Sequence, residues 1–270
     1  MRVDLHIHSN NSDGSESVET IIDMAKRKGI DAIAITDHDN VNGLARAHEY
    51  AVDKVQLISG IELSTYDEIE IHMLGYGIDY TSDIIVNKTA ELVEQRKERI
   101  RKILSRLRDE RVYIDDEEID YSCAGRLQIA RLMLSKGYVT CINEAFQRYL
   151  GPEGSAYIPS ARLHPIEAID IVTSAGGTPV LAHPEKYLRA GRLEGMLDTY
   201  MEHGLGGLEC NYPSHSHSVT VKLRALARER HLIETVGSDY HGTNGVNELG
   251  QVRVKMSEED IALLSSTHRV

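Results

Sequence analysis

The chain has 270 residues and a formal charge of −12, from 30 Lys and Arg against 42 Asp and Glu, and 41% of its residues are hydrophobic. This composition is that of a globular protein, and it excludes a disordered chain, a collagen-like chain and a small disulfide scaffold. The acidic balance argues against a protein that binds long duplex nucleic acid through backbone charge, because such proteins are basic. The 13 histidines beside the excess of carboxylates direct attention to transition-metal ligands.

The sequence shows no signal for export or membrane insertion. It opens on the strand-like residues 1–8, without a basic segment followed by an apolar one. Its apolar runs stay well below the roughly 18 residues that a membrane span needs. The three cysteines, Cys123, Cys141 and Cys210, form no C-x-x-C pair. We therefore expect a cytoplasmic protein with no disulfide framework and no membrane partner.

Short strands and helices alternate in the first part of the chain. Residues 3–8 predict a strand because apolar and polar side chains alternate along them. Residues 17–28 predict a helix that ends at Gly29. The next predicted elements are a strand over 32–36, a helix over 43–52, and strands over 57–63 and 70–76. This alternation is typical of a parallel β/α architecture.

Helical patterns interrupt this alternation from about residue 81. Residues 84–111 predict one long charged helix, and 91–111 carry eight basic and five acidic residues. Its apolar residues form one stripe, through Leu92, Ile100, Ile103, Leu104 and Leu107. This helix could bind nucleic acid, or it could be a solvated helix whose exposed face carries Glu–Lys and Glu–Arg pairs. After Gly151 and Pro152 the β/α alternation resumes, with predicted helices over 165–175, 193–203 and 218–229 and strands over 178–182, 207–210 and 234–237. We therefore expect a barrel built from 1–80 and 158–270, with 81–157 as a helical insertion that caps the substrate.

Metal-ligating residue types recur where the predicted strands end. His6 and His8 lie two apart on the first strand, so both imidazoles leave the same face. Glu62 lies in a predicted buried strand, where a carboxylate is costly unless it is paired or ligating. Parallel barrels place their sites at this end of the strands. The full set of six imidazoles and three carboxylates is His6, His8, Asp13, His38, Glu62, His72, His183, Asp239 and His241.

Taken singly, each of these residues is equally compatible with a turn or with a hydrogen-bonded core position. Taken together, the nine predict a polynuclear site. Imidazoles with carboxylates suit Zn, Mn or Fe better than Ca or Mg. Two or three ions would account for so many ligands, with Glu62 as a bridge.

These residues lie in motifs that resemble the PHP (polymerase and histidinol phosphatase) family. The motifs are Asp4-Leu-His6-Ile-His8, Ser12-Asp13-Gly14, Thr36-Asp37-His38-Asp39, Gly60-Ile-Glu62, His72, Ala182-His183-Pro184 and Gly237-Ser-Asp239-Tyr-His241. The resemblance implies an α/β fold, a distorted seven-stranded (β/α) barrel similar to a TIM barrel, with three divalent metal ions. By this resemblance one ion would take His6, His8, Glu62 and Asp239, a second Glu62, His72 and His183, and a third Asp13, His38 and His241.

The insertion resembles that of the TrpH-like (YciV-type) branch of the family, in Gly125-Arg126-Leu-Gln128-Ile-Ala-Arg131. The resemblance implies a metal-dependent phosphoesterase that acts on short RNA with a 5′ phosphate or on nucleoside 3′,5′-bisphosphates. Gln128 and Tyr212 stand where the branch usually has His. Both positions are expected to face the substrate.

Clustered divalent ions would supply hydroxide at neutral pH, and we expect a metal-bridging hydroxide to attack phosphorus in line. The residues expected to be catalytic are His8, Asp13, His38, Asp239 and His241. Those expected to bind the substrate are Arg126, Arg131, Lys186 and His215, for which an ordinary surface position is the alternative. Asp4 and Asp37 are expected to orient ligand histidines.

Three other functions are compatible with parts of this pattern. An amidohydrolase also opens with H-x-H, but it would leave Asp13 and His38 without a role. A histidinol-phosphate phosphatase would share the family and the chemistry. A non-catalytic module would be expected to have lost ligands, whereas all nine positions are filled here. We expect a small phosphorylated substrate as the partner, and the sequence predicts no oligomeric state.

Overall fold

The computed structural model describes residues 1–119, 121, 125–159 and 162–266. The chain divides into two compact units, which are Met1–Thr89 with Arg162–Val270, and Ala90–Ala161. The first unit contains all the strands of the described chain, and the second is helical. Cys123 lies outside the described residues, while Cys141 and Cys210 are free thiols.

Seven strands of the first unit form one sheet in chain order. They are β1 (Val3–Asp4), β2 (Ala32–Ile35), β3 (Gln56–Asp67), β4 (Ile69–Tyr76), β5 (Thr178–Leu181), β6 (Gly207–Asn211) and β7 (Ile233–Val236). Beyond β1 the chain returns to the last strand, because the Leu5 amide donates to the Val236 carbonyl at 3.0 Å and Ile7 bridges Tyr240. The sheet is therefore a nearly closed barrel, which confirms the predicted fold class.

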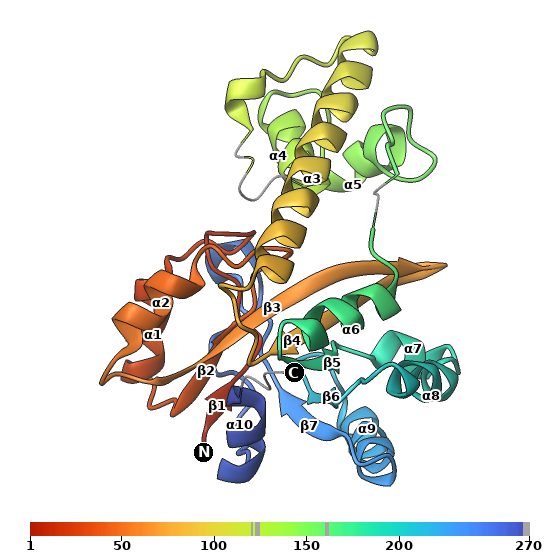
Figure 1. Cartoon of the computed structure of the whole chain (residues 1–270). Coiled ribbons are helices and arrows are strands. Elements are labelled where there is room, and N and C mark those ends of the chain that lie inside the picture. The colour runs from red at the N-terminus through yellow and green to blue at the C-terminus, as the bar shows by residue number, and fades with distance from the viewer. Residues whose placement is uncertain (120, 122–124, 160–161, 267–270) are drawn as a thin grey trace. The chain divides into compact units, whose positions relative to one another are not determined.

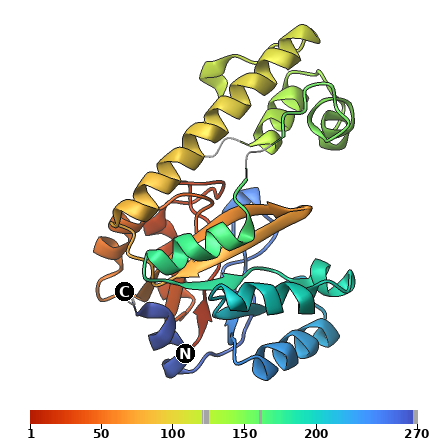
Figure 2. The same ribbon diagram turned by 45° about the vertical axis from the view of Figure 1, so that its right-hand side comes forward.

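One strand departs from the expected parallel arrangement. β4 runs antiparallel to both β3 and β5, whereas the other neighbouring strands are parallel. The cause is local, since only Glu68, at φ 57°, separates β3 from β4. So short a connection forms a hairpin, while a parallel pair needs a long crossover. Figure 2 shows the resulting long hairpin in orange.

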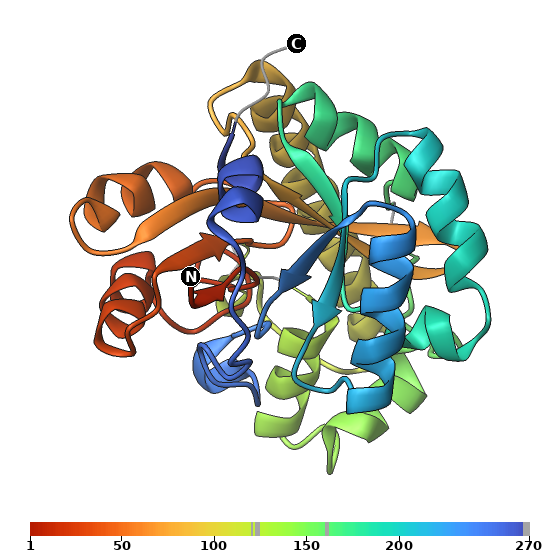
Figure 3. The same ribbon diagram turned by 90° about the horizontal axis from the view of Figure 1, so that it is seen from below.

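Helices surround the strands of the first unit (Figures 1 and 3). Those of this unit are α1 (Val18–Arg27), α2 (Leu44–Ala51), α6 (Pro165–Ser174), α7 (Glu185–Arg189), α8 (Leu193–Glu202), α9 (His217–Glu229) and α10 (Glu258–Ser265). The predicted helix over 17–28 corresponds to α1, which Ser17 caps by accepting from the Thr20 amide at 3.2 Å. Val18, Ile21, Ile22 and Ala25 form its buried face. The apolar spacing in the sequence thus selects the face that packs on the barrel.

The interior of the barrel is filled by side chains from nearly every strand. Its buried core includes Val3, Ala34, Ile58, Leu74 and Val180, each at most 1% exposed. Burial of this apolar set is the main favourable term in forming the barrel. The filled core leaves the strand ends and their loops to carry polar function.

The amino terminus is tied to the carboxyl-terminal part of the chain. The Met1 ammonium donates to the Met256 carbonyl at 2.7 Å, and Arg2 bridges Lys255. Figure 2 shows the amino terminus beside α10, an element that the sequence analysis did not predict.

The second unit has its own core. The long helix α3 (Asp83–Asp109) begins in the first unit, and α4 (Arg126–Ser135) and α5 (Ile142–Ala145) follow it. Short turns complete the unit: a 3₁₀ turn over Asp116–Glu118 and a π-helical turn over Phe146–Leu150. Ile100, Ile103 and Leu107 of α3 are fully buried against Ile129 and Met133 of α4. The predicted apolar stripe of the long helix is therefore its packing face.

None of the described helices combines the length and the hydrophobicity that crossing a membrane would require.

Candidate metal centre

The nine predicted ligands come from six of the seven strands or the loops that follow them. His6 and His8 follow β1, Asp13 lies in the next turn, and His38 follows β2. Glu62 and His72 lie within the β3–β4 hairpin, His183 follows β5, and Asp239 and His241 follow β7. His6 and His8 are completely buried and Glu62 is 1% exposed, whereas Asp13 retains 46% of its side-chain exposure. The centre therefore has a buried floor and one side open to solvent.

The first group of side chains meets at Glu62. Its Oε2 lies 3.2 Å from Nε2 of His6 and 3.1 Å from Nε2 of His8. Asp239 Oδ1 lies 3.4 Å and 3.2 Å from the same two nitrogens. Two imidazoles and two carboxylates thus present four ligand atoms that lie within 4.8 Å of one another. This is the set that the family resemblance implies for one ion.

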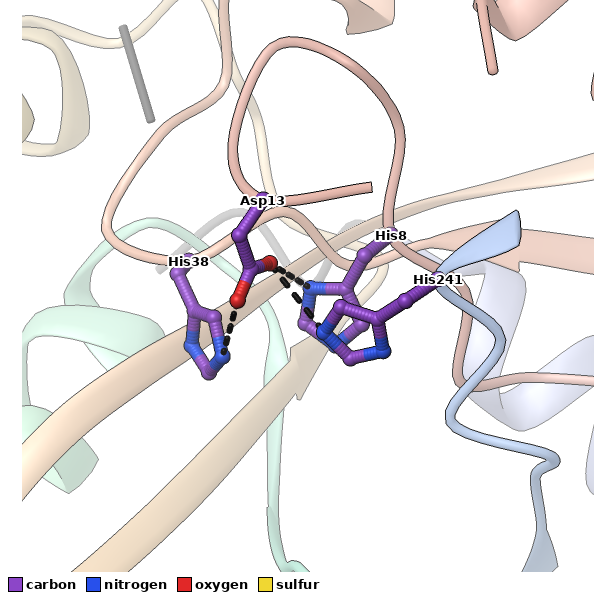
Figure 4. A group of neighbouring side chains, drawn as sticks. All are labelled: His8, Asp13, His38 and His241. Carbon is purple, nitrogen blue, oxygen red and sulfur yellow. Dashed lines mark ion pairs between the residues drawn. The ribbon is translucent and has the colours of Figure 1, made fainter. Parts of the chain in front are cut away.

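A second group surrounds Asp13 (Figure 4). Asp13 Oδ1 lies 3.1 Å from His241 Nε2 and 3.6 Å from His8 Nδ1, and Oδ2 lies 3.9 Å from His38 Nε2. The structure therefore adds His8 to the expected set of Asp13, His38 and His241. The two nitrogens of His8 face different groups, so its imidazole lies between them.

The third group uses the other oxygen of Glu62. Oε1 lies 3.0 Å from His72 Nδ1 and 3.2 Å from His183 Nε2. His38 Nδ1 lies 3.2 Å from Oε2 of the same carboxylate. The ligand atoms of His38, Glu62 and His72 lie within 4.8 Å of one another, whereas His183 contacts Glu62 but does not belong to that group. Glu62 thus contacts imidazoles on both sides, as expected of a bridging ligand.

The charges within the centre favour a cation. Burial would lower the pKa of His8, but the carboxylates of Asp239 and Glu62 raise it to about 10. Burial would also lower the pKa of His72, but the charge of Glu62 raises it to about 9. Burial would raise the pKa of Glu62, but the imidazoles of His38, His6 and His72 hold it well below its usual range. The carboxylate stays ionised, and metal ions, which bind neutral imidazole, would displace protons from the centre.

Several buried ligand atoms lie in ion-pair contacts but make no hydrogen bond of normal geometry among the described residues. They are Nε2 of His6, both ring nitrogens of His8, Nδ1 of His38 and Oε2 of Glu62. An unsatisfied buried polar atom costs about 1–3 kcal/mol, so a cluster of them calls for a ligand. Imidazole nitrogens and carboxylate oxygens are donors that divalent transition metals take. The residues therefore fit divalent metal ions.

Asp4 and Asp37, the two carboxylates expected to orient ligand histidines, contact the loops that carry the candidate ligands. Asp4 accepts from the amide of Ser238 at 2.8 Å and from that of Gly250 at 2.7 Å. Asp37 accepts from the amide of Ser9 at 2.7 Å and from the hydroxyl of Ser12 at 2.6 Å. These contacts are with backbone amides and serine hydroxyls, and the expected role of both residues in orienting the ligand histidines stays a prediction. They hold the backbone of the loops from which the ligands extend.

Glu209 and Tyr212 are supporting residues whose contacts the sequence analysis did not predict. Glu209, on β6, contacts the ring of His6 and the backbone of His183. The Tyr212 hydroxyl donates to Asp239 Oδ2 at 2.7 Å. A sequence signal existed for Glu209, since it is an acidic residue within an apolar strand, as is Glu62. No pattern in the sequence indicates the partner of Tyr212.

The predicted substrate-binding residues occupy different surroundings. His215 donates from Nδ1 to the Cys210 carbonyl at 3.1 Å, and its ring lies 5.2 Å from that of Tyr212, which in turn lies 5.6 Å from that of His183. Burial lowers the pKa of His215. The Lys186 ammonium lies 5.0 Å from the ring of Tyr187, and burial lowers its pKa despite the charge of Glu70. Both residues belong to the first unit with the candidate ligands.

Arg126 and Arg131 belong to the second unit. The Arg126 guanidinium donates to the Leu150 carbonyl at 3.1 Å and lies 5.7 Å from the rings of Phe146 and Tyr157. Arg131 is exposed on α4. Their roles in binding substrate stay predictions.

Comparison with known sequences identifies relatives along most of the chain. The sequence model of the PHP domain family matches residues 4–151. "5′-3′ exoribonuclease Rnm" of Escherichia coli is 32% identical, over 92% of this chain and 88% of the relative. "Phosphoribosyl 1,2-cyclic phosphate 1,2-diphosphodiesterase" of Eggerthella lenta is 30% identical, over 90% and 95%. "3′,5′-nucleoside bisphosphate phosphatase" of Chromobacterium violaceum is 30% identical, over 88% and 87%.

Solved structures share the same fold. A protein of Bifidobacterium adolescentis, described as a proposed metal-dependent phosphoesterase, superposes with a TM-score of 0.82 at 27% identity and covers 97% of this chain and 94% of its own. A Chromobacterium violaceum protein, described as an amidohydrolase with bound sulfate and no metal, gives a TM-score of 0.77 at 27% identity, over 92% and 91%. The similarity therefore extends over nearly the full length of both molecules.

Proposed function

Because the chain belongs to the PHP domain family and is a metal-dependent phosphoesterase acting on nucleotides, we propose that its substrates are nucleoside 3′,5′-bisphosphates or short RNA with a 5′ phosphate. The names of the Escherichia coli and Chromobacterium violaceum relatives support these two substrate classes. The observation that carries the chemistry is the convergence of imidazoles and carboxylates on both oxygens of Glu62.

We further propose three divalent ions, of Mn, Fe or Zn, in this centre. His6, His8, Glu62 and Asp239 would hold one, and Asp13, His38 and His241 another, with His8 at the border between them. Glu62, His72 and His183 would hold the last, with His38 beside Glu62 and His72. Such ions lower the pKa of bound water and offset charge on phosphoryl oxygens. Glu62 keeps the groups close together because its two oxygens face different imidazoles.

The open side of the centre would receive the phosphate ester. Asp13 is the most exposed of the candidate ligands, at 46% of its side chain. In this proposal Lys186 and His215, both in the unit that carries the candidate ligands, contact the substrate. Lys suits this role because its ammonium donates to phosphate oxygens.

A substrate screen tests the proposal. Phosphate release would be measured with added Mn²⁺ on a nucleoside 3′,5′-bisphosphate, a 5′-monophosphate, 5′-phosphorylated short RNA, phosphoribosyl 1,2-cyclic phosphate and histidinol phosphate, with hydrolysis of dihydroorotate followed in parallel. We expect release from the bisphosphate or the RNA. Activity confined to histidinol phosphate, or to the amide, would contradict the proposed substrate class.

Replacement of Asp13 tests the metal centre without disturbing the core. Asp13→Ala removes a carboxylate that is 46% exposed and contacts His241, so the fold should survive while metal content falls and hydrolysis is lost. Asp170→Ala, at an exposed position on α6, is the control and should change neither. Metal content would be read by elemental analysis beside phosphate release. Full activity of the Asp13 variant, or of metal-stripped protein, would contradict the assignment.

A further inference from the structure

Glu209 is a carboxylate at the centre of a buried strand. It is 0% exposed, and its neighbours Leu208 and Cys210 are also fully buried. A carboxylate in such surroundings is costly unless both of its oxygens have partners. Both oxygens of Glu209 have such partners.

One oxygen of Glu209 contacts the ring of a candidate ligand. Oε1 lies 3.0 Å from Nδ1 of His6. Because a carboxylate only accepts, Nδ1 of His6 carries a proton, and the neutral ring that a metal ion would bind offers its lone pair at Nε2. That Nε2 is the atom that lies 3.2 Å from Glu62 and 3.4 Å from Asp239. Glu209 thus selects the tautomer of His6 that offers a nitrogen to the centre.

The other oxygen holds the backbone of a second candidate ligand. Oε2 accepts from the His183 amide at 2.7 Å. His183 has a φ of 26°, a conformation that a residue with a side chain rarely adopts, and it is maintained only where its surroundings hold it. In this conformation its Nε2 lies 3.2 Å from Oε1 of Glu62. The same carboxylate therefore positions ligands that face opposite oxygens of Glu62.

Gly237 leaves the space for this contact. A Cβ at this position would lie 2.2 Å from the Cβ of His6 and 2.7 Å from Oε1 of Glu209. Any side chain at position 237 would therefore clash with both His6 and Glu209 and disturb their contact. Residues after β1 and β5, on β6 and after β7 all meet at this point.

We propose that Glu209 is a positioning residue of the metal centre, which fixes the ring of His6 with one oxygen and the backbone of His183 with the other. The proposal rests on the metal centre of the proposed function. Outer carboxylates of this kind typically change metal affinity by roughly 10–100-fold when they are replaced.

The test is Glu209→Gln, which keeps the size of the side chain. Both partners of Glu209 are donors, and the amide group of Gln would confront one of them with a further donor. We expect the affinity for Zn²⁺, measured by competition with a chelator, to fall by roughly 10–100-fold, with the circular dichroism of the metal-free protein unchanged. The control is Glu234→Gln on β7, whose carboxylate pairs with Arg224 and Arg228, and it should bind Zn²⁺ as the wild type does.

A second measurement needs no substitution and covers the case in which the variant fails to fold. Nitrogen-15 NMR of the histidines in zinc-loaded wild-type protein should show His6 protonated at Nδ1 and metal-bound at Nε2. Zinc on Nδ1 of His6, or wild-type affinity in the Glu209 variant, would overturn the role of Glu209 alone. Failure of the wild-type protein to bind any of Zn²⁺, Mn²⁺ and Fe²⁺ would overturn the metal centre together with this role.

Discussion

At the scale of single residues, Glu62 is the side chain on which the centre depends most. It is 1% exposed, and its oxygens are divided, with Oε2 facing His6 and His8 and Oε1 facing His72 and His183. Asp239 is divided in the same way, because Oδ1 faces the imidazoles while Oδ2 accepts from Tyr212. Each carboxylate is thus held in one orientation by partners on both of its oxygens.

Replacement of Tyr212 by Phe tests whether the contact with Tyr212 orients the carboxylate of Asp239. The substitution removes only the hydroxyl that donates to Asp239 at 2.7 Å. A hydrogen bond to a charged group is worth about 1.5–3 kcal/mol, so we expect metal affinity to fall about tenfold or more. Affinity would be measured by chelator competition. Tyr50→Phe is the control, since its hydroxyl donates to Asp23 at 3.0 Å between α2 and α1, and equal affinities in the two variants would contradict the role of Tyr212.

At the scale of elements, the β3–β4 hairpin brings two candidate ligands, Glu62 and His72, into contact. Glu62 lies on β3 and His72 on β4, with Glu62 opposite Leu74 and Ser64 opposite His72. β3 also packs closely on β2 at Gly60, where a Cβ would lie 2.8 Å from the Ile35 carbonyl oxygen. The position of Glu62 therefore depends on a close approach of two strands.

The same substitution at two glycines should have opposite effects. Gly60→Ala forces β3 from the backbone of β2, and we expect it to destabilise the protein by about 1–3 kcal/mol. Gly195→Ala, on α8 with nothing within 4 Å of the added methyl, should stabilise it by about 0.5–1 kcal/mol. Denaturant unfolding of both variants measures this difference. A Gly60 variant as stable as the wild type would show that the strands can separate without cost.

At the scale of the whole molecule, all nine candidate ligands belong to the first unit. They lie on or after strands that span the sheet from β1 to β7. Metal ions bound to them would add links between loops that direct hydrogen bonds, such as those from Ser9 to Asp37 and from Tyr212 to Asp239, already join. Ligands that bind the folded state alone stabilise it, by about 2.7 kcal/mol at a hundredfold excess over the dissociation constant.

Removal of metal should therefore affect the two units differently. We expect a chelator to lower the melting temperature and to increase hydrogen exchange in peptides of the ligand-bearing loops. Exchange in α4, within the core of the second unit, should stay unchanged because none of the candidate ligands lies there. Exchange measured by mass spectrometry with and without chelator, peptide by peptide, tests this. An equal increase in both units would contradict it.

Much of the fold was predictable from local patterns. The spacing of apolar residues predicted α1, α6 and the buried stripe of α3, because amphipathic periodicity reports which face packs. The orientation of β4 was not predictable from its own residues, since the apolar pattern of a buried strand is the same whichever way the strand runs. It follows from the single residue, Glu68, that separates β4 from β3.

The sequence by itself determined which residue types stand at the strand ends, and with them the family and the class of chemistry. Only the tertiary structure decided which atoms meet: that Glu62 divides its oxygens, that His8 borders two groups, and that Glu209 and Tyr212 support their neighbours. Asp4 and Asp37 illustrate why the sequence alone does not give these contacts. Their partners are mostly backbone amides and serine hydroxyls of loops that are distant in the sequence. Periodicity fixes the face of an element, whereas the pairing of atoms depends on how the closing barrel brings separate loops together.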